Sequence, residues 1–261
     1  MRKLVGTVLL VLASTVMTGC VTENLIMEGK DKYRVSSGVD HKKAALGRVQ
    51  IALRLLEDGN ATLAKDNLEV ALKFDPDCFD AKLAYAWYYQ RVGETANAYR
   101  AYDDLVSDYS DKGDVFNNYG IFLCSEGKYP EAYQMYERAV VIPKYTRIAE
   151  TLVNAGRCAY KQGDDNRAIK YVDRALQYNG NDAFTLAFRA ELALGVGDLK
   201  KAREMMMRYS RYAPDDAYSL FTKLRIEEGS GHKDRAQYFG QKLLQEYPNS
   251  PEAQKYTTNN Y

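Results

Sequence analysis

The stretch NNYGIFLCSEGKYPEA, residues 117–132, contains the three signals that decide the fold. Gly127 permits the positive φ that ends one helix and turns the chain into the next. Gly120, seven residues earlier, and Ala132, five residues later, are small enough to let two helix axes approach closely. The stretch therefore predicts the end of one helix, a tight turn and the start of a second helix.

The same three signals recur along the chain. The turn glycines are spaced 34, 34, 36, 34 and 34 residues apart, and they are Gly59, Gly93, Gly127, Gly163, Gly197 and Gly231. An alanine follows each glycine by five residues, and a small residue precedes each by seven, except for Leu224 in the last repeat. A period of 34 residues is that of the tetratricopeptide (TPR) repeat, a pair of helices. We therefore predict an all-α, right-handed superhelical solenoid of six TPR repeats, with one concave and one convex side.

This register predicts the organisation of the chain. Residues 1–19 are a cleaved signal peptide, 20–40 a lipidated N-terminus and tether, 41–250 the six repeats, and 251–261 a short C-terminal cap or tail. Pro76, Pro214 and Pro248 end the second helix of their repeats, since proline lacks the amide donor. The repeats are expected to begin near Ala45, Phe79, Gly113, Ala149, Ala183 and Ala217.

The N-terminus indicates a lipid anchor. MRK precedes a mostly apolar stretch over residues 4–17, which is too short to span a bilayer comfortably, and Thr18-Gly19-Cys20 follows. This layout resembles the lipobox of bacterial lipoproteins, in which the cysteine is acylated and becomes the first mature residue. An ordinary signal peptide with an incidental cysteine is the alternative. Val21, where aspartate would retain the protein, predicts by analogy with enterobacterial sorting an outer-membrane lipoprotein facing the periplasm.

Composition argues against several classes of function. The mature chain has 34 basic and 35 acidic side chains, so a nucleic-acid partner is not expected. His41, in the tether region, and His232, in the last repeat, cannot meet on a linear solenoid. The carboxylates alternate with basic residues as on solvated helix faces, and no cysteine or histidine cluster indicates a metal. We expect no enzyme, cofactor or small-molecule substrate, and we interpret tyrosines at helical spacing, such as Tyr85 and Tyr89, as packing residues.

Two cysteines are placed to form a disulfide. Cys124 and Cys158 fall late in the first helices of the third and fourth repeats. Because such helices pack side by side, the two thiols can meet, and the periplasm is oxidising. We predict this bond, with a pair of buried thiols as the alternative. Cys78, in the loop after a second helix, is left as the odd cysteine.

The opening stretch also carries a family resemblance. Asn117-Asn118-Tyr119-Gly120-Ile121-Phe122-Leu123-Cys124, followed by Gly127, Tyr129 and Glu131-Ala132, resembles the type IV pilus biogenesis lipoprotein family PilF/PilW. The resemblance continues through Pro143-x-Tyr145, which carries the two-residue insertion, into Asn154-Ala155-Gly156-x-Cys158. Members of that family act as pilotins, which carry or help to assemble the pilus secretin in the outer membrane. The resemblance thus implies a role in biogenesis of the fimbrium and in twitching motility.

Spacing alone indicates only a membrane-tethered interaction scaffold. A TPR lipoprotein adaptor for outer-membrane β-barrel assembly or for peptidoglycan hydrolases has the same architecture and is the main alternative. An enzyme with an unrecognised site is a further alternative, and the missing chemistry argues against it.

A candidate partner-binding groove lies on the first two repeats. The groove-facing positions of the first repeat are all aliphatic, and the second repeat adds two large apolar residues: Leu46, Val49, Leu53, Leu56, Leu83 and Trp87. Ile51, Ala52 and Leu55 are expected to pack against the second helix, so this stripe is surplus to the core. The fourth repeat has a polar groove, with Glu150, Val153, Arg157 and Lys161. We expect an apolar segment of the secretin to dock on the stripe; the alternative is that the tether or a neighbouring helix covers it.

Overall fold

The computed structural model describes residues 40–258, and these residues form an all-α solenoid of TPR repeats. The predicted signal peptide, the predicted lipidation site at Cys20 and the predicted tether up to residue 39 lie outside the described residues. Within residues 40–258 there are thirteen helices and no strand. Their bounds are α1 (His41–Glu57), α2 (Ala61–Phe74), α3 (Phe79–Arg91), α4 (Thr95–Asp108), α5 (Gly113–Ser125), α6 (Tyr129–Val140), α7 (Ile148–Gln162), α8 (Asp165–Tyr178), α9 (Ala183–Gly195), α10 (Leu199–Tyr209), α11 (Ala217–Gly229), α12 (Lys233–Glu246) and α13 (Pro251–Thr258).

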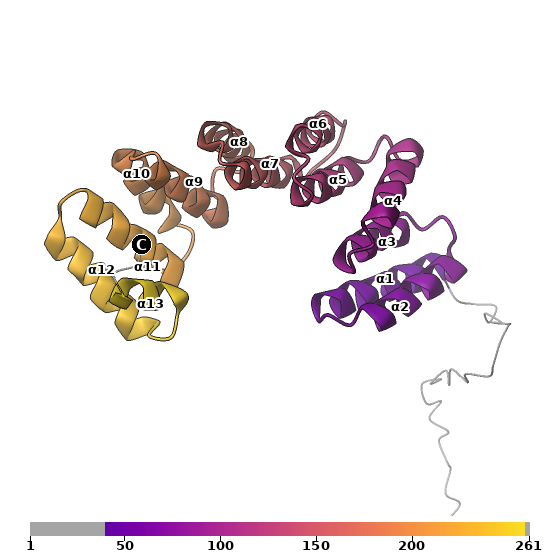
Figure 1. Ribbon diagram of the computed structural model, residues 1–261, viewed down its shortest axis with the longest axis horizontal. Coiled ribbons are helices and arrows are strands. Elements are labelled where there is room, and N and C mark those ends of the chain that lie inside the picture. Colours follow the sequence, from indigo (N-terminus) through magenta and orange to yellow (C-terminus); the bar gives the residue numbers. More distant parts are fainter. Residues whose placement is uncertain (1–39, 259–261) are drawn as a thin grey trace, which may run out of the picture. The chain divides into compact units, whose positions relative to one another are not determined.

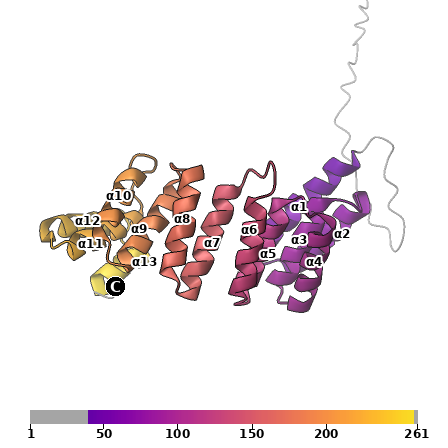
Figure 2. The ribbon, with the colours of Figure 1, turned by 90° about the horizontal axis from the view of Figure 1, so that it is seen from above.

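The first twelve helices form six pairs that follow one another in chain order (Figures 1 and 2). The odd-numbered helices form one layer and the even-numbered helices the other, and we call the outer surfaces of these layers the A-helix face and the B-helix face (Figure 1). Each odd-numbered helix from α3 to α11 packs against the even-numbered helices before and after it. Within residues 40–258, successive even-numbered helices make no comparable contact with each other. Each of these odd-numbered helices is therefore the floor of a furrow between two even-numbered ones.

The turn inside each pair depends on glycine. All six glycines identified from the spacing have a positive φ, between 76° and 85°. At the turn before α6, the Gly127 amide donates to the carbonyl of Cys124 at 3.2 Å, and the Lys128 amide donates to that of Leu123 at 2.9 Å. A residue with a Cβ is strained at this φ, so the backbone itself accounts for the glycine register.

Small residues at the helix crossings make room for large side chains of the second helix. A Cβ added at Gly120 would lie 2.7 Å from Cε1 of Tyr136, and one added at Gly156 would lie 2.7 Å from Cγ2 of Val172. Tyr136 and Val172 are both buried, so neither can move aside. Close helix packing in the third and fourth repeats therefore depends on these two glycines.

The helix starts follow the predicted register closely. The helices α3, α5, α9 and α11 begin at the expected residues, and α7 begins one residue early. The start of α1 is four residues early because Asp40 caps it: its Oδ1 accepts a 3.2 Å hydrogen bond from the Lys43 amide. His41 is therefore the first residue of α1 rather than part of the tether, and its ring lies 6.2 Å from that of Phe74.

The 36-residue interval between Gly127 and Gly163 contains a segment that packs the third repeat against the fourth. The segment that connects α6 to α7 turns at Lys144, which has a positive φ of 64°. Beyond this turn, the Tyr145 ring covers Gly113 so closely that a Cβ there would overlap it. The Tyr145 hydroxyl lies 2.9 Å from Oγ1 of Thr151 in α7. The insertion thus places an aromatic ring over the start of the third repeat and ties it to the fourth.

Candidate partner-binding surfaces

The aliphatic stripe predicted on the first repeat is only partly accessible. Val49 and Leu56 are 4% and 2% exposed, and they belong to the hydrophobic core that α1 shares with α2 and α3. The prediction that they face an open groove is wrong, because α3 packs alongside α1 at these positions. Ile51, expected to pack against the second helix, is instead 48% exposed.

A smaller apolar surface remains on α1 and α3. Leu46 is 40% exposed, while Leu53, Leu83 and Trp87 are half-buried. The guanidinium of Arg91, one turn along α3, lies 5.9 Å from the centroid of the Trp87 ring. These four apolar residues are what the structure leaves of the predicted groove.

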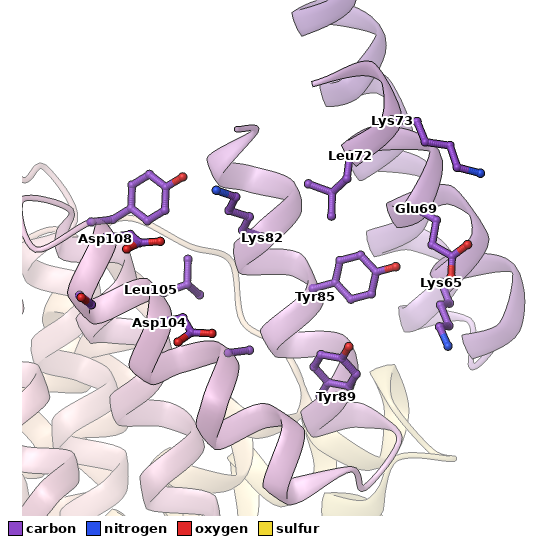
Figure 3. Close-up of a pocket in the computed structure, with 13 residues that line it drawn as sticks. Lys65, Glu69, Leu72, Lys73, Lys82, Tyr85, Tyr89, Asp104, Leu105 and Asp108 are labelled. Carbon is purple, nitrogen blue, oxygen red and sulfur yellow. The ribbon is translucent and has the colours of Figure 1, made fainter. Parts of the chain in front are cut away.

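A cleft of 740 Å³ lies between α2 and α4, in the furrow floored by α3 (Figure 3). Leu72 of α2 and Leu105 of α4 line its opposite sides, and Tyr85 and Tyr89 of α3 lie between them (Figure 3). The remaining lining residues are Lys65, Glu69, Lys73, Lys82, Ala101, Asp104, Ser107, Asp108 and Tyr109. The cleft therefore has an apolar and aromatic interior with charges of both signs around it.

The polar groups of this cleft are oriented by neighbours. Lys82 pairs with Asp77 at 3.6 Å, and its Nζ lies 5.5 Å from the centroid of the Tyr109 ring. Interaction with Tyr109, followed by the attraction of Asp77, raises the pKa of Lys82 and keeps it cationic. Burial, followed by the charge of Glu69, raises the pKa of Tyr85, so its hydroxyl stays protonated and can donate a hydrogen bond. An apolar and aromatic interior with charged groups around it suits an amphipathic protein segment.

This cleft was not predicted from the sequence, because Tyr85 and Tyr89 were interpreted as packing residues. The two tyrosines are four residues apart and share one side of α3, with ring centroids 5.8 Å apart. Leu83 and Trp87 are offset from them by about half a turn and lie on the opposite side. In the sequence, the α3 segment therefore has apolar residues on two faces, whereas packing within its own repeat needs only one.

The residues that carry the family resemblance meet between α5 and α7. A disulfide joins Cys124 to Cys158, with an S–S distance of 2.11 Å and a Cα–Cα distance of 5.8 Å. One turn or more before the disulfide on the same two helices, Asn154 donates a hydrogen bond to Asn117. The pairing is the one expected from the sequence, and Cys78 is a free, buried cysteine.

Residues 40–258 contain neither a bilayer-spanning helix nor a cluster of metal ligands. None of the helices there has the length and apolar character needed to cross a bilayer. No group of three or more His, Cys, Asp or Glu side chains in that range is arranged to hold a metal ion. His41 lies at the start of α1, whereas His232 precedes α12.

The chain has relatives along most of its length. Residues 149–182, the fourth repeat, match the tetratricopeptide repeat family. An uncharacterized protein of Haemophilus influenzae is 37% identical over 148 residues, which cover 57% of this chain and 83% of that protein. The type IV pilus assembly protein PilF of Pseudomonas aeruginosa is 28% identical over 240 residues, which cover 92% of this chain and 93% of PilF.

Solved structures agree with the sequence relatives. The Pseudomonas aeruginosa PilF structure matches with a TM-score of 0.67 and 27% identity, over 84% of this chain and 99% of PilF. The structure of PilW, described as a widely conserved type IV pilus biogenesis factor, matches with a TM-score of 0.69 and 26% identity. That match covers 81% of this chain and 97% of PilW. The chain is a PilF/PilW-like tetratricopeptide-repeat protein.

Proposed function

We propose that the chain acts in type IV pilus biogenesis as a pilotin, a non-enzymatic adaptor that binds the pilus secretin and promotes its localisation and multimer assembly in the outer membrane. The observation that carries this proposal is the extent of the similarity to PilF, which spans 92% of the chain rather than one generic repeat. Adaptor roles in β-barrel assembly or peptidoglycan hydrolysis have only the repeat architecture in their favour.

The proposed location is the periplasmic side of the outer membrane, with lipid on Cys20. A disulfide between Cys124 and Cys158 supports an oxidising compartment. Several acyl chains on one cysteine make anchoring effectively permanent, since each buried methylene contributes about 0.8 kcal/mol. A Cys20→Ser variant should therefore be lost from the outer-membrane fraction. Continued firm association of that variant with the outer membrane would contradict the anchor.

The secretin segment is proposed to dock in the cleft between α2 and α4. Its apolar side chains would contact Leu72 and Leu105, and its charged flanks would meet the lysines and carboxylates around the opening. A volume of 740 Å³ is that of a pocket that buries a small ligand, so the cleft can admit a few side chains of such a segment. A segment lying here would also fill the furrow that separates the two even-numbered helices.

A matched pair of substitutions on α4 tests this docking site. Ala101 lines the cleft, whereas Ala96 is exposed on the same helix and does not line it. Ala101→Arg fills the cleft with a long cation and should prevent co-purification of the secretin from detergent-solubilised outer membranes, while Ala96→Arg should leave it unchanged. Circular dichroism would check that both variants fold. Equal secretin recovery with the two folded variants would show that the cleft is not the docking site.

A further inference from the structure

A second set of exposed aromatic side chains lies on the odd-numbered helices of the last three repeats. Tyr160 of α7, Phe184 of α9 and Tyr218 of α11 are 48%, 53% and 38% exposed. The fourth repeat is therefore not simply polar as the sequence predicted: Arg157 and Lys161 are exposed, but Tyr160 lies between them in sequence. Exposed aromatic rings on three consecutive helices of one layer need a physical reason.

The backbones of α7 and α9 approach each other less closely than those of α1 and α3 or of α5 and α7. Long side chains bridge these helices instead. The Arg157 guanidinium lies 4.3 Å from the centroid of the Phe184 ring, and the Tyr160 ring meets Phe188 edge to face at 5.9 Å. The surface here is thus made of rings and one guanidinium.

The aromatic surface continues onto α11. Burial is the main cause that raises the pKa of Tyr218, and the charge of Glu191 and the nearby Tyr160 raise it further. Tyr218 lies on α11, which packs against α9, and Arg225 of α11 donates hydrogen bonds to Glu191 of α9. Tyr218 is therefore on the helix of this layer that follows the one carrying Phe184. The raised pKa keeps the Tyr218 hydroxyl protonated.

The charges on this surface do not cancel. Arg225 donates two hydrogen bonds to Glu191, at 2.8 and 3.0 Å, and so neutralises that carboxylate. Lys161 donates to the backbone carbonyls of Cys124 and Ser125, both at 3.3 Å. Arg157 stacks on Phe184, and no carboxylate within residues 40–258 forms an ion pair with it. A positive charge therefore remains beside the exposed rings.

We propose that Arg157, Tyr160, Phe184, Phe188 and Tyr218 form a docking site for an extended peptide segment of a partner protein, in which a carboxylate side chain neighbours an aromatic one. Stacking on Phe184 uses the face of the guanidinium and leaves its N–H edge free for a bidentate contact with a carboxylate. The exposed rings offer faces for the aromatic side chain. This site lies on different repeats from the cleft and goes beyond the proposed secretin contact.

The test uses the detergent-solubilised full-length protein and two fluorescein-labelled synthetic peptides. One peptide alternates phenylalanine and aspartate, and the other has asparagine in place of each aspartate. Fluorescence anisotropy should show that the aspartate peptide binds about tenfold more tightly. Arg157→Gln should abolish that preference, and Phe184→Ser should weaken both peptides. Lys170→Gln, an exposed cation lost from α8, should change neither affinity.

Three results would overturn the proposal. The first is equal affinity for the two peptides, and the second is a preference for aspartate that survives in folded Arg157→Gln protein. The third is a dimer in analytical ultracentrifugation that dissociates on Phe184→Ser substitution, because the surface would then be an interface between two copies of this chain. Thermal unfolding of each variant would establish that it is folded, which is expected because the Arg157 and Phe184 side chains are exposed.

Discussion

Asn154 of α7 donates a 3.0 Å hydrogen bond from Nδ2 to Oδ1 of Asn117 on α5, a side chain that is only 1% exposed. A buried amide costs free energy when its partner is lost, so this bond specifies which residues of the two helices face each other. The disulfide between Cys124 and Cys158 lies one helical turn or more further along the same two helices. Together they fix the register of the third and fourth repeats.

This hydrogen bond gives a testable double-mutant cycle. Asn154→Ala should lower the free energy of unfolding by about 1–3 kcal/mol, because it leaves the buried Asn117 amide unsatisfied. In an Asn117→Leu background the hydrogen bond is already absent, so the same substitution should cost less than about 1 kcal/mol. Urea unfolding of the four proteins measures the coupling. Equal costs in both backgrounds would mean that the bond contributes no stability.

The disulfide should stabilise the fold measurably. By the loop-entropy model, closing a ring of about 35 residues contributes about 3–4 kcal/mol to the free energy of unfolding. Reductant should lower the urea midpoint of the wild type to near that of Cys124→Ser/Cys158→Ser, and the double variant should not respond to reductant. Alkylation of unfolded, unreduced protein should label Cys78 but neither bonded cysteine. Labelling at all three positions would show that the bond is absent in the protein as isolated.

The sequence was most informative where backbone conformation is dictated by a single residue type. Glycine at a positive φ recurs with a fixed period, so the turns and most helix starts followed from the spacing. The start of α1 did not, because Asp40 caps the helix four residues before the repeat register begins. Tyr145 lay in the predicted insertion, but its packing on Gly113 depends on the turn at Lys144, which the spacing does not encode.

Two glycine-to-alanine substitutions should have opposite effects on stability. At Gly120 the new Cβ would meet the buried Tyr136 ring at 2.7 Å, so Gly120→Ala should destabilise by about 1–3 kcal/mol. At Gly47, within α1, no atom lies within 4 Å of the new Cβ. Gly47→Ala should therefore stabilise by about 0.5–1 kcal/mol, because alanine restricts the unfolded chain. Thermal unfolding would show the direction of the stability change in each variant. A stabilising effect of Gly120→Ala would contradict the tight helix crossing.

The sixth repeat should make stability sensitive to acid. Glu227 is 3% exposed and accepts hydrogen bonds from Arg203 at 3.1 Å. Burial alone would raise the pKa of Glu227, but Arg203, His232 and Arg235 outweigh it and lower the pKa below the ordinary 4.5. The stabilisation is therefore present above pH 4.5 and is lost as the pH falls through the lowered folded-state value.

Urea unfolding between pH 7 and pH 3 tests this dependence. Glu227→Gln should lose about 2–4 kcal/mol at pH 7, because the arginine is left without its carboxylate, and its stability should fall less steeply with acid. Glu57→Gln, which removes an exposed carboxylate at the end of α1, should keep the wild-type slope. The stability of Glu227→Gln should still fall somewhat with decreasing pH because of Asp215. Burial would raise the pKa of Asp215, but Lys223 and Lys242 outweigh it and lower that pKa. Identical slopes in all three proteins would contradict the assignment.

The candidate site was harder to predict than the fold because it depends on contacts between repeats. Repeat positions alone assigned Val49 and Leu56 to an open groove, but whether such positions are covered is decided by how closely the next helix of the layer approaches. The cleft beside Tyr85 and Tyr89 arises from the separation of α2 and α4, which no local pattern reports. Periodicity gives the side of a helix on which a residue lies, and packing decides whether that side is accessible.

The remaining apolar surface on the A-helix face gives the last prediction. Leu46 and Ile51 are both aliphatic side chains of α1 and are 40% and 48% exposed, but they are offset by about 140° around the helix. If the secretin docks only in the cleft, as proposed, Leu46→Lys and Ile51→Lys should both retain secretin multimers, because neither side chain lines the cleft. Quantifying the multimers in outer membranes, with circular dichroism as the folding control, separates the two faces of the first repeat. Loss of multimers with folded Leu46→Lys but not with Ile51→Lys would place the contact on the surface formed by Leu46, Leu53, Leu83 and Trp87, and a charge there would act by being desolvated without a partner.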